Sequence, residues 1–145
     1  MIKVKNLSRK FGDFTAVDSL SFNVPKGQIV GLLGHNGAGK TTTLKMLTGY
    51  LEPSSGEISI NKLKVHENRI KIQNNLGYLP EQSPLYPEMT IVEYLDYVSK
   101  LRNIPESKRK KCIKKAIEAT SIANKAFSPI NTLSKGYKQR VGVAQ

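Results

Sequence analysis

The sequence predicts an α/β protein, and three observations support this fold class. The first part of the chain holds short alternating or apolar segments that are typical of strands. The last part holds amphipathic segments with helical spacing, and a glycine-rich stretch separates an apolar run from a helical segment. The change in character falls in the proline-bounded loop 80–87, so we expect a β-containing domain over residues 1–85 and a helical domain over residues 86–145.

Four segments of the first part have the pattern of strands. Residues 2–7 start with alternating apolar and basic side chains, and Leu20, Phe22 and Val24 alternate with polar residues, as do residues 57–60. The run QIVGLL at residues 28–33 is almost continuously apolar and follows a turn signal at residues 25–27. This run predicts a strand that is buried on both faces, as in a parallel sheet.

Helical spacing occurs at three places before the C-terminal segment. Leu44, Met46 and Leu47 follow the glycine-rich stretch. Thr90 and Glu93 form a capping-box pattern that opens a helix, and Pro105 is expected to stop it. A second helix is expected over residues 107–119.

Composition excludes some classes of protein. No apolar run is long enough to span a membrane, and the single cysteine, Cys112, excludes an internal disulfide and a cysteine-cluster zinc site. The net charge of +12 is uneven, because residues 100–145 hold 12 Lys and Arg but 2 Asp and Glu. Such a basic segment indicates either an anionic partner or an acidic segment elsewhere in the protein.

The stretch GHNGAGKT at residues 34–41 matches the phosphate-binding pattern G-x-x-x-x-G-K-[ST] at every fixed position. A phosphate chain must touch successive backbone N–H groups, so glycines are needed where side chains would push it away. The helix that follows adds its unpaired N–H groups and the positive end of its dipole. We therefore expect a nucleoside triphosphate to bind the loop and the first helical turn: Gly34, His35, Asn36, Gly37, Ala38, Gly39, Lys40, Thr41 and Thr42.

Within this loop we expect three different roles. Lys40 reaches the β- and γ-phosphates, and the hydroxyl of Thr41 holds Mg²⁺. His35 occupies a variable position of the pattern, so we expect it to line the site without a chemical role.

Two further stretches narrow the class of phosphate-binding-loop protein to which the chain can belong. YLPEQSPLYPEMTIVEYL at residues 78–95 places Gln82 in a loop before a helix, and LSKGYKQRVGVAQ at residues 133–145 places Ser134 and Gly136 at the start of another helix. In order and spacing the chain resembles the ATPase domain of ABC transporters, with its Walker A, Q-loop and LSGGQ-type signature motifs. The exact residues of these motifs are most similar to those of bacterial exporter-type ATPase subunits. The gliding-motility ATPases are the narrower group that they resemble.

The resemblance implies a P-loop NTPase fold with an antiparallel β subdomain and an α-helical subdomain, and roles for four more residues. Phe11 matches the aromatic residue that stacks on adenine, with Phe14 as the competing candidate, and Gln82 matches the glutamine that contacts Mg²⁺ or the attacking water. With Lys40, Gln82 is the expected catalytic residue. Ser134 and Gly136 match the residues that meet the γ-phosphate held by the opposite subunit.

The signature match is imperfect, and part of the family pattern is missing. Lys135 and Tyr137 stand where the family usually has glycine and glutamine. No apolar run ends in the carboxylate that phosphoryl transfer requires, because Asp18 and Asp96 both lie in unsuitable contexts. We therefore expect an incomplete domain, the N-terminal part of an ABC ATPase truncated before Walker B and the switch histidine, which does not hydrolyse ATP by itself.

The resemblance implies the ATP-binding subunit of an ABC transporter, which hydrolyses Mg-ATP in its full-length form. Its expected partners are a transmembrane permease subunit and a second ABC ATPase domain in a head-to-tail dimer, at the cytoplasmic face of the membrane. The alternative is a soluble ABC ATPase that contacts nucleic acid or ribosomes through the basic stretch 107–115. No nucleic acid is expected as a partner, because no aromatic residues interleave with those lysines. A P-loop protein outside the ABC class is the third alternative, and it would make the signature match accidental.

Overall fold

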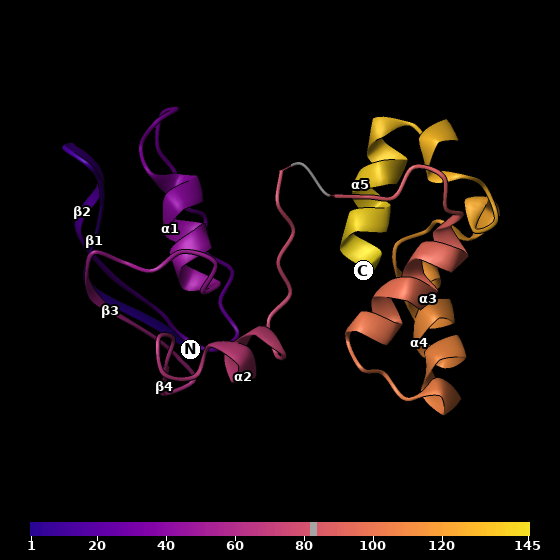
Figure 1. Ribbon diagram of the computed structural model, residues 1–145, viewed down its shortest axis with the longest axis horizontal. Coiled ribbons are helices and arrows are strands. Elements are labelled where there is room, and N and C mark those ends of the chain that lie inside the picture. Colours follow the sequence, from indigo (N-terminus) through magenta and orange to yellow (C-terminus); the bar gives the residue numbers. More distant parts are fainter. Residues whose placement is uncertain (82–83) are drawn as a thin grey trace. The chain divides into compact units, whose positions relative to one another are not determined.

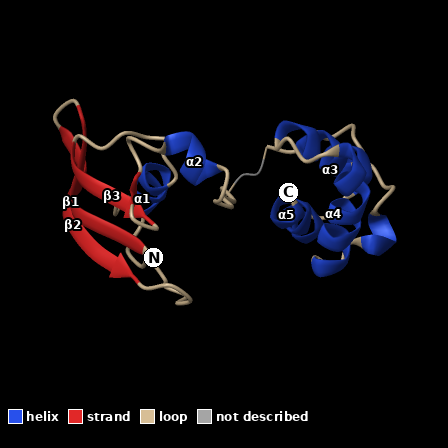
Figure 2. Cartoon of the chain, turned by 90° about the horizontal axis from the view of Figure 1, so that it is seen from below, coloured by secondary structure: helices blue, strands red, loops and turns tan. Residues whose placement is uncertain are grey.

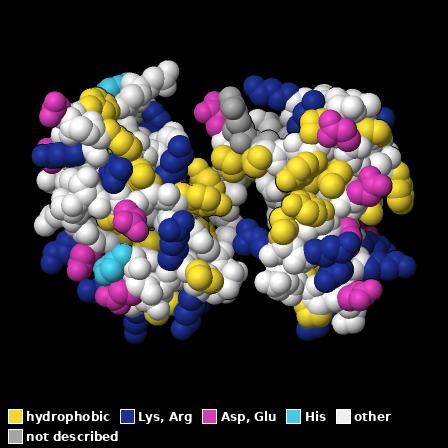
Figure 3. Space-filling view, viewed as in Figure 1, with side chains coloured by type: hydrophobic (Ala, Val, Ile, Leu, Met, Phe, Trp, Pro, Cys, Tyr) yellow, Lys and Arg dark blue, Asp and Glu magenta, His cyan; other side chains and the backbone are white. Residues whose placement is uncertain are grey.

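The computed structural model describes residues 1–81 and 84–145, and the chain divides into two compact units (Figure 1). The sheet unit, Met1–Tyr78, and the helical unit, Leu79–Gln145, each have their own cluster of buried apolar side chains. Lysine and arginine side chains stand on the surface of both units (Figure 3). The predicted α/β class, with an antiparallel sheet and a group of helices, is confirmed.

The sheet unit is built on four antiparallel strands in the order β2-β1-β3-β4. Figure 2 shows the three longer strands, β1, β2 and β3, together in this sheet. The strands predicted near residues 2–7, 20–24 and 57–60 are present and longer than expected, and the short β4 was not predicted. Their bounds are β1 Ile2–Phe11, β2 Phe14–Val24, β3 Ser55–Ile60 and β4 Leu63–Lys64.

One face of the sheet packs against helix α1, Lys40–Leu47. Val4 and Leu7 of β1 are three residues apart and still both turn inward, because the β1–β2 register shifts between them. There they share a core with Ile58 of β3 and Met46 of α1. Leu7 and Met46 are both fully buried. A short helix, α2 Arg69–Gln73, adds Ile72 to the same core.

The prediction of a buried strand over residues 28–33 is wrong for this chain. The segment has no regular secondary structure, and Ile29 and Leu33 are 102% and 92% exposed. A strand of this kind needs neighbouring strands to pair its N–H and C=O groups and layers on both faces to cover its side chains. Within residues 1–81 and 84–145, no strand pairs with it.

The helical unit packs three helices around one core. They are α3 Ile91–Leu101, α4 Glu106–Ala119 and α5 Lys135–Ala144, with two 3₁₀ turns, Ala123–Lys125 and Ile130–Thr132, between α4 and α5. Ile91, Ile122 and Val141 are fully buried in this core. Among the described residues, no helix is both long and apolar enough to cross a bilayer.

The predicted capping box at the start of α3 is confirmed. The N–H of Thr90 donates to Glu93 Oε2 at 2.8 Å, and the N–H of Glu93 donates to Thr90 Oγ1 at 3.3 Å. The N–H and the hydroxyl of Thr90 both donate to the Glu93 carboxylate. These two bonds stabilise the charged form, so the pKa of the Glu93 carboxyl is lowered from its ordinary value. At the other end, α3 stops at Leu101, and Pro105 directly precedes α4.

Candidate nucleotide-binding site

The loop 34–41 joins an exposed segment without regular secondary structure to helix α1. Helix α1 begins at Lys40, and Gly39 is its N-cap residue in the left-handed conformation. Residues 34–38 are exposed, so their backbone is open to a ligand. The helix predicted after the glycine-rich stretch is therefore confirmed, while the strand predicted before it is not formed.

Two glycines have backbone angles that other residues rarely adopt. Gly37 has φ of 86° and Gly39 has φ of 79°. A Cβ atom on Gly39 would also lie 2.3 Å from the carbonyl oxygen of Ala16 and 2.9 Å from Val17 Cγ2. Glycine at this position therefore lets the loop lie directly against strand β2, which fixes where α1 begins.

The ammonium group of Lys40 folds back over the loop. Its Nζ donates hydrogen bonds to the carbonyl oxygens of Gly34 and His35, each at 2.7 Å. The Nδ1 atom of His35 lies 2.7 Å from the carbonyl oxygen of Asn36. The lysine is therefore held at the loop and directed away from the core.

The N-terminus of α1 leaves backbone donors at the same place. The first helical bond runs from the N–H of Thr43 to the carbonyl oxygen of Gly39 at 2.8 Å, so the N–H groups of Lys40, Thr41 and Thr42 have no intrahelical acceptor. The first turn contains no acidic residue, and the side chain of Thr41 is exposed. Free donors, a helix dipole and one ammonium group form an arrangement that suits an anion such as a phosphate chain.

Phe11 ends strand β1 and pairs with Phe14 across the β1–β2 hairpin. Both rings are exposed, and the guanidinium carbon of Arg9 lies 4.6 Å from the centre of the Phe11 ring. The structure thus presents an exposed aromatic ring in the same unit as the loop.

Gln82 lies outside the described residues. Across the described residues, no group of three or more His, Cys, Asp or Glu side chains is placed to hold a metal ion. Of the two residues expected to hold Mg²⁺, Thr41 lies within the described residues, in the first turn of α1.

Ser134 and Gly136 lie at the start of α5 in the helical unit. Ser134 is the N-cap residue, and its side chain accepts a long hydrogen bond of 3.5 Å from the N–H of Tyr137. A Cβ atom on Gly136 would meet nothing within 4 Å. The start of α5 is therefore capped and open to its surroundings.

Tyr137 stabilises the start of this helix. It is one of the two residues that depart from the family pattern. Its hydroxyl lies 3.2 Å and 3.3 Å from the side-chain nitrogen and oxygen of Asn124. The guanidinium of Arg140 lies 5.6 Å from the Tyr137 ring centre and donates to the carbonyl oxygen of Ser121 at 3.3 Å. These contacts tie the first turns of α5 to the segment that follows α4.

Sequence reasoning missed two residues that shape these features. Ala16 receives the close approach of Gly39, and Asn124 receives the hydroxyl of Tyr137. Both contacts join segments that lie apart along the chain, and no local pattern marks either residue.

The glycine loop on an α/β scaffold, with a lysine at the N-terminus of the following helix, defines the class of P-loop NTPases. The protein-family model described as "ABC transporter" matches residues 17–145. Because that match covers most of the chain, the protein belongs to the ABC transporter family.

The comparisons with individual proteins agree. The chain is 39% identical over 140 residues to an uncharacterised ABC transporter ATP-binding protein of Methanocaldococcus jannaschii, covering 97% of the chain and 49% of that protein. Two solved structures are similar over 99% of the chain. The first, cbiO1 of Clostridium perfringens, part of the ABC transporter complex cbiONQ, has a TM-score of 0.87 and 26% identity, with 59% of its chain covered. The second, the dimeric cassette MJ0796 bound to ADP and Pi, has a TM-score of 0.85 and 25% identity, with 68% of its chain covered.

The chain spans about half or less of the length of the curated relatives it matches. The resemblance found in the sequence and the P-loop NTPase fold are both confirmed.

Proposed function

We propose that the full-length protein containing these residues binds and hydrolyses Mg-ATP as the energising subunit of an ABC transporter. The observation that carries the proposal is the geometry of residues 34–42. Unpaired N–H groups at the start of α1 and the ammonium group of Lys40 gather at one exposed loop. Family membership supports the same reading, as does a similar cassette described as bound to ADP and Pi.

In this proposal the backbone from Gly34 to Thr42 cradles the phosphates. Lys40 exchanges its two bonds to loop carbonyls for bonds to phosphate oxygens, which are stronger because both partners are charged. Positioning and charge neutralisation supply most of the catalysis of phosphoryl transfer, so Lys40 acts as a catalytic residue. His35, Asn36 and Ala38 line the loop through their backbone.

Mg²⁺ is implied by the family, and the hydroxyl of Thr41 and the side chain of Gln82 would hold it. Oxygen donors of this kind fit the preference of Mg²⁺, and Thr41 is exposed at the start of α1. When bound, the ion neutralises charge that develops on the phosphates. The exposed ring of Phe11 offers a flat apolar face for the adenine.

The helical part contributes to a composite site between two ATPase domains. Ser134 and Gly136 meet the γ-phosphate of the nucleotide bound to the opposite domain, which requires a head-to-tail dimer. Residues 1–85 form the ATP-binding core in this proposal, and residues 86–145 form the helical subdomain. A transmembrane permease subunit holds the dimer at the cytoplasmic face of the membrane, consistent with a similar protein described as part of a transporter complex.

Calorimetry with Mg-ATP on the full-length protein tests nucleotide binding. Lys40→Ala is expected to weaken binding at least about tenfold, because charge-assisted bonds are lost. Lys45→Ala is the matched control, since Lys45 is an exposed lysine in the last turn of the same helix. Equal binding by the wild type and Lys40→Ala would contradict the proposal.

Turnover is a separate test on the 145-residue chain. In residues 1–81 and 84–145 no strand ends in a carboxylate, so phosphate release from ATP is expected to stay at background. Release above background by the chain alone, and not by its Lys40→Ala variant, would show that residues 1–145 suffice for hydrolysis.

A further inference from the structure

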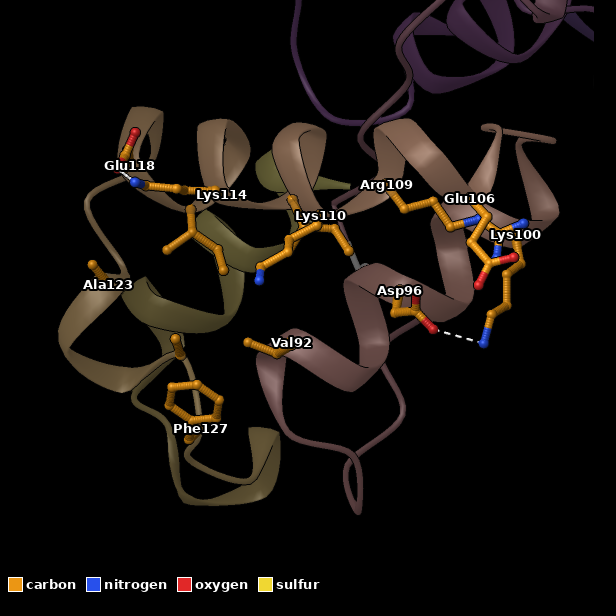
Figure 4. Close-up of a pocket in the computed structure, with 13 residues that line it drawn as sticks. Val92, Asp96, Lys100, Glu106, Arg109, Lys110, Lys114, Glu118, Ala123 and Phe127 are labelled. Carbon is orange, nitrogen blue, oxygen red and sulfur yellow. Dashed lines mark ion pairs between the residues drawn. The ribbon is translucent and has the colours of Figure 1, made fainter.

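A groove of about 640 Å³ between α3 and α4 specifies no occupant, because its charges are nearly balanced (Figure 4). Glu106 and Glu118 line it from α4, beside lysine and arginine side chains of the same helix. On the α3 side, Asp96 and Lys100 form an ion pair at 2.6 Å. The end of strand β1 is more specific, because there one cation and one aromatic ring are packed together.

The guanidinium of Arg9 lies over the ring of Phe11, two residues further along β1. Its central carbon is 4.6 Å from the ring centre, which is within the range of a cation–π contact. The Nε atom of Arg9 is buried and has no hydrogen-bond acceptor in the part of the chain that the structure describes. Because this side of the guanidinium is shielded from water, its attraction to the ring is stronger than at an exposed site.

Three hydrogen bonds hold this end of β1 to the segment that follows α1. The Nη1 atom of Arg9 donates to the carbonyl oxygen of Glu52 at 2.9 Å. The N–H of Lys10 donates to Ser54 Oγ at 3.0 Å, and the N–H of Ser54 donates to the carbonyl oxygen of Ser8 at 2.8 Å. The guanidinium is therefore fixed in position and can hold the ring beneath it.

The hairpin that carries Phe11 also contacts the phosphate-binding loop. Phe11 pairs with Phe14 across the hairpin, and Ala16 lies two residues, about 7 Å, further along β2. The carbonyl oxygen of Ala16 is the atom against which Gly39 of the loop lies. The ring and the loop are thus at the same end of the β1–β2 hairpin. Phe11 is 46% exposed, so part of its ring stays open although Arg9 covers one face.

We propose that Arg9 is a positioning residue of the nucleotide site, which holds one face of the Phe11 ring so that the adenine of ATP stacks on the other face. This inference rests on the proposed function, because it requires a nucleotide at the loop 34–42. A ring that is already ordered loses less conformational freedom when the base binds. The cation also draws the electrons of the ring toward itself, which favours a purine on the opposite face.

Phe14 has no such support. Its ring is 63% exposed, and within residues 1–81 and 84–145 no cation or aromatic ring is recorded against it. The base would have to order this ring as it binds. The contact with Arg9 therefore selects Phe11 as the stacking ring.

Calorimetry on the full-length protein compares Mg-ATP with Mg-tripolyphosphate, which carries the phosphates without the base. Arg9→Met removes the cation and keeps a long side chain, and it is expected to weaken ATP binding about fivefold while tripolyphosphate binding stays within about twofold. Arg9→Gln lacks the charge but keeps a donor for the carbonyl of Glu52, and it should show the same difference between the ligands. Lys10→Met is the matched control, because Lys10 is the exposed neighbouring lysine, and it is expected to bind both ligands as the wild type does.

A double-mutant cycle tests whether Arg9 acts through the ring. Phe11→Leu removes the stacking surface and is expected to weaken ATP binding about tenfold or more. In the Phe11→Leu background, Arg9→Met is expected to change ATP binding by less than about twofold, since the ring on which Arg9 acts is gone. Melting temperatures of the variants check that each is folded.

Three outcomes would overturn the inference. The first is unchanged ATP binding by Arg9→Met and Arg9→Gln, or equal weakening of both ligands, as a loss of structure would cause. The second is an undiminished effect of Arg9→Met in the Phe11→Leu background. The third is a larger loss of ATP binding in Phe14→Leu than in Phe11→Leu.

Lys40 separates this inference from the proposed function. Lys40→Ala is expected to weaken the binding of both ligands, because both carry the phosphates. If neither ligand depended on Lys40, the proposed function would fail and the inference with it. If both depended on Lys40 but ATP binding did not depend on Arg9, the inference alone would fail.

Discussion

The two units differ in how completely their apolar segments are covered. In the helical unit, Ile91, Ile122 and Val141 from separate segments bury one another fully. In the sheet unit, α1 covers one sheet face, yet the apolar run 28–33 beside the phosphate-binding loop lies in the open. The difference follows from hydrogen bonding, because a helix satisfies its backbone internally while a strand depends on its neighbours.

Amide hydrogen exchange on the 145-residue chain gives the largest expected contrast between the units. No backbone hydrogen bond is recorded for the N–H groups of residues 28–33 in the described part of the chain. These amides are expected to exchange near the rate of an unfolded peptide, while those in the middle of α3 exchange roughly a thousandfold more slowly. Mass spectrometry of peptides from both segments measures the ratio.

If residues 28–33 were protected from exchange as strongly as α3, the proposed difference between the two units would be contradicted. It would mean that the segment pairs with a strand in solution, either within the chain or with a second copy. Dilution distinguishes these two cases, because only pairing between copies weakens as the concentration falls.

A matched pair of substitutions tests the same difference through the free energy of unfolding. Ile122→Ala removes a fully buried side chain and is expected to lower the free energy of unfolding by about 2–5 kcal/mol. Ile29→Ala removes the same atoms from a side chain that is 102% exposed, and the expected change is below about 0.5 kcal/mol. Urea denaturation followed by circular dichroism gives both values, and similar costs for the two would contradict the structure.

Local sequence patterns predicted the elements that are stabilised locally. The capping box at Thr90, the hairpin strands and the helix after the glycine loop all depend on residues close together in sequence, and all are present. The strand at 28–33 was predicted from an apolar pattern alone. Such a pattern indicates burial, but it does not show which segments would cover the strand. In the candidate site, too, the local features were predicted and the contacts between distant segments were not.

The phosphate-binding loop was recognised from eight consecutive residues, whereas one contact beside this loop and one contact at the start of α5 were not. Gly39 against Ala16 and Tyr137 against Asn124 join segments whose approach depends on the folded backbone. A local stretch of sequence does not indicate which distant residues will come into contact. The short strand β4 and helix α2 were missed because each is only a few residues long.

The capping box provides a smaller and more local test of the helical unit. Thr90→Ala removes the side chain that accepts the N–H of Glu93, and it is expected to lower the free energy of unfolding by about 1 kcal/mol. Thr90→Ser keeps the acceptor oxygen and is expected to retain most of that stability. Urea midpoints for the three proteins decide the question, and a midpoint for Thr90→Ala equal to that of the wild type would show that the cap is not used in solution.

The smallest expected effect is the pH dependence of the same cap. Thr90 donates to the Glu93 carboxylate and lowers its pKa in the folded state, so the contribution is present above the unfolded pKa of Glu93 and is lost as pH falls through the folded value. Acidification below about pH 4 is therefore expected to lower the urea midpoint of the wild type more than that of Glu93→Ala. Glu93→Gln keeps an acceptor for the N–H of Thr90 without the charge, so its midpoint should lose the same pH dependence. If the difference between wild type and Glu93→Ala instead grew with acidification, the folded pKa would be raised, and the cap would not act through the carboxylate.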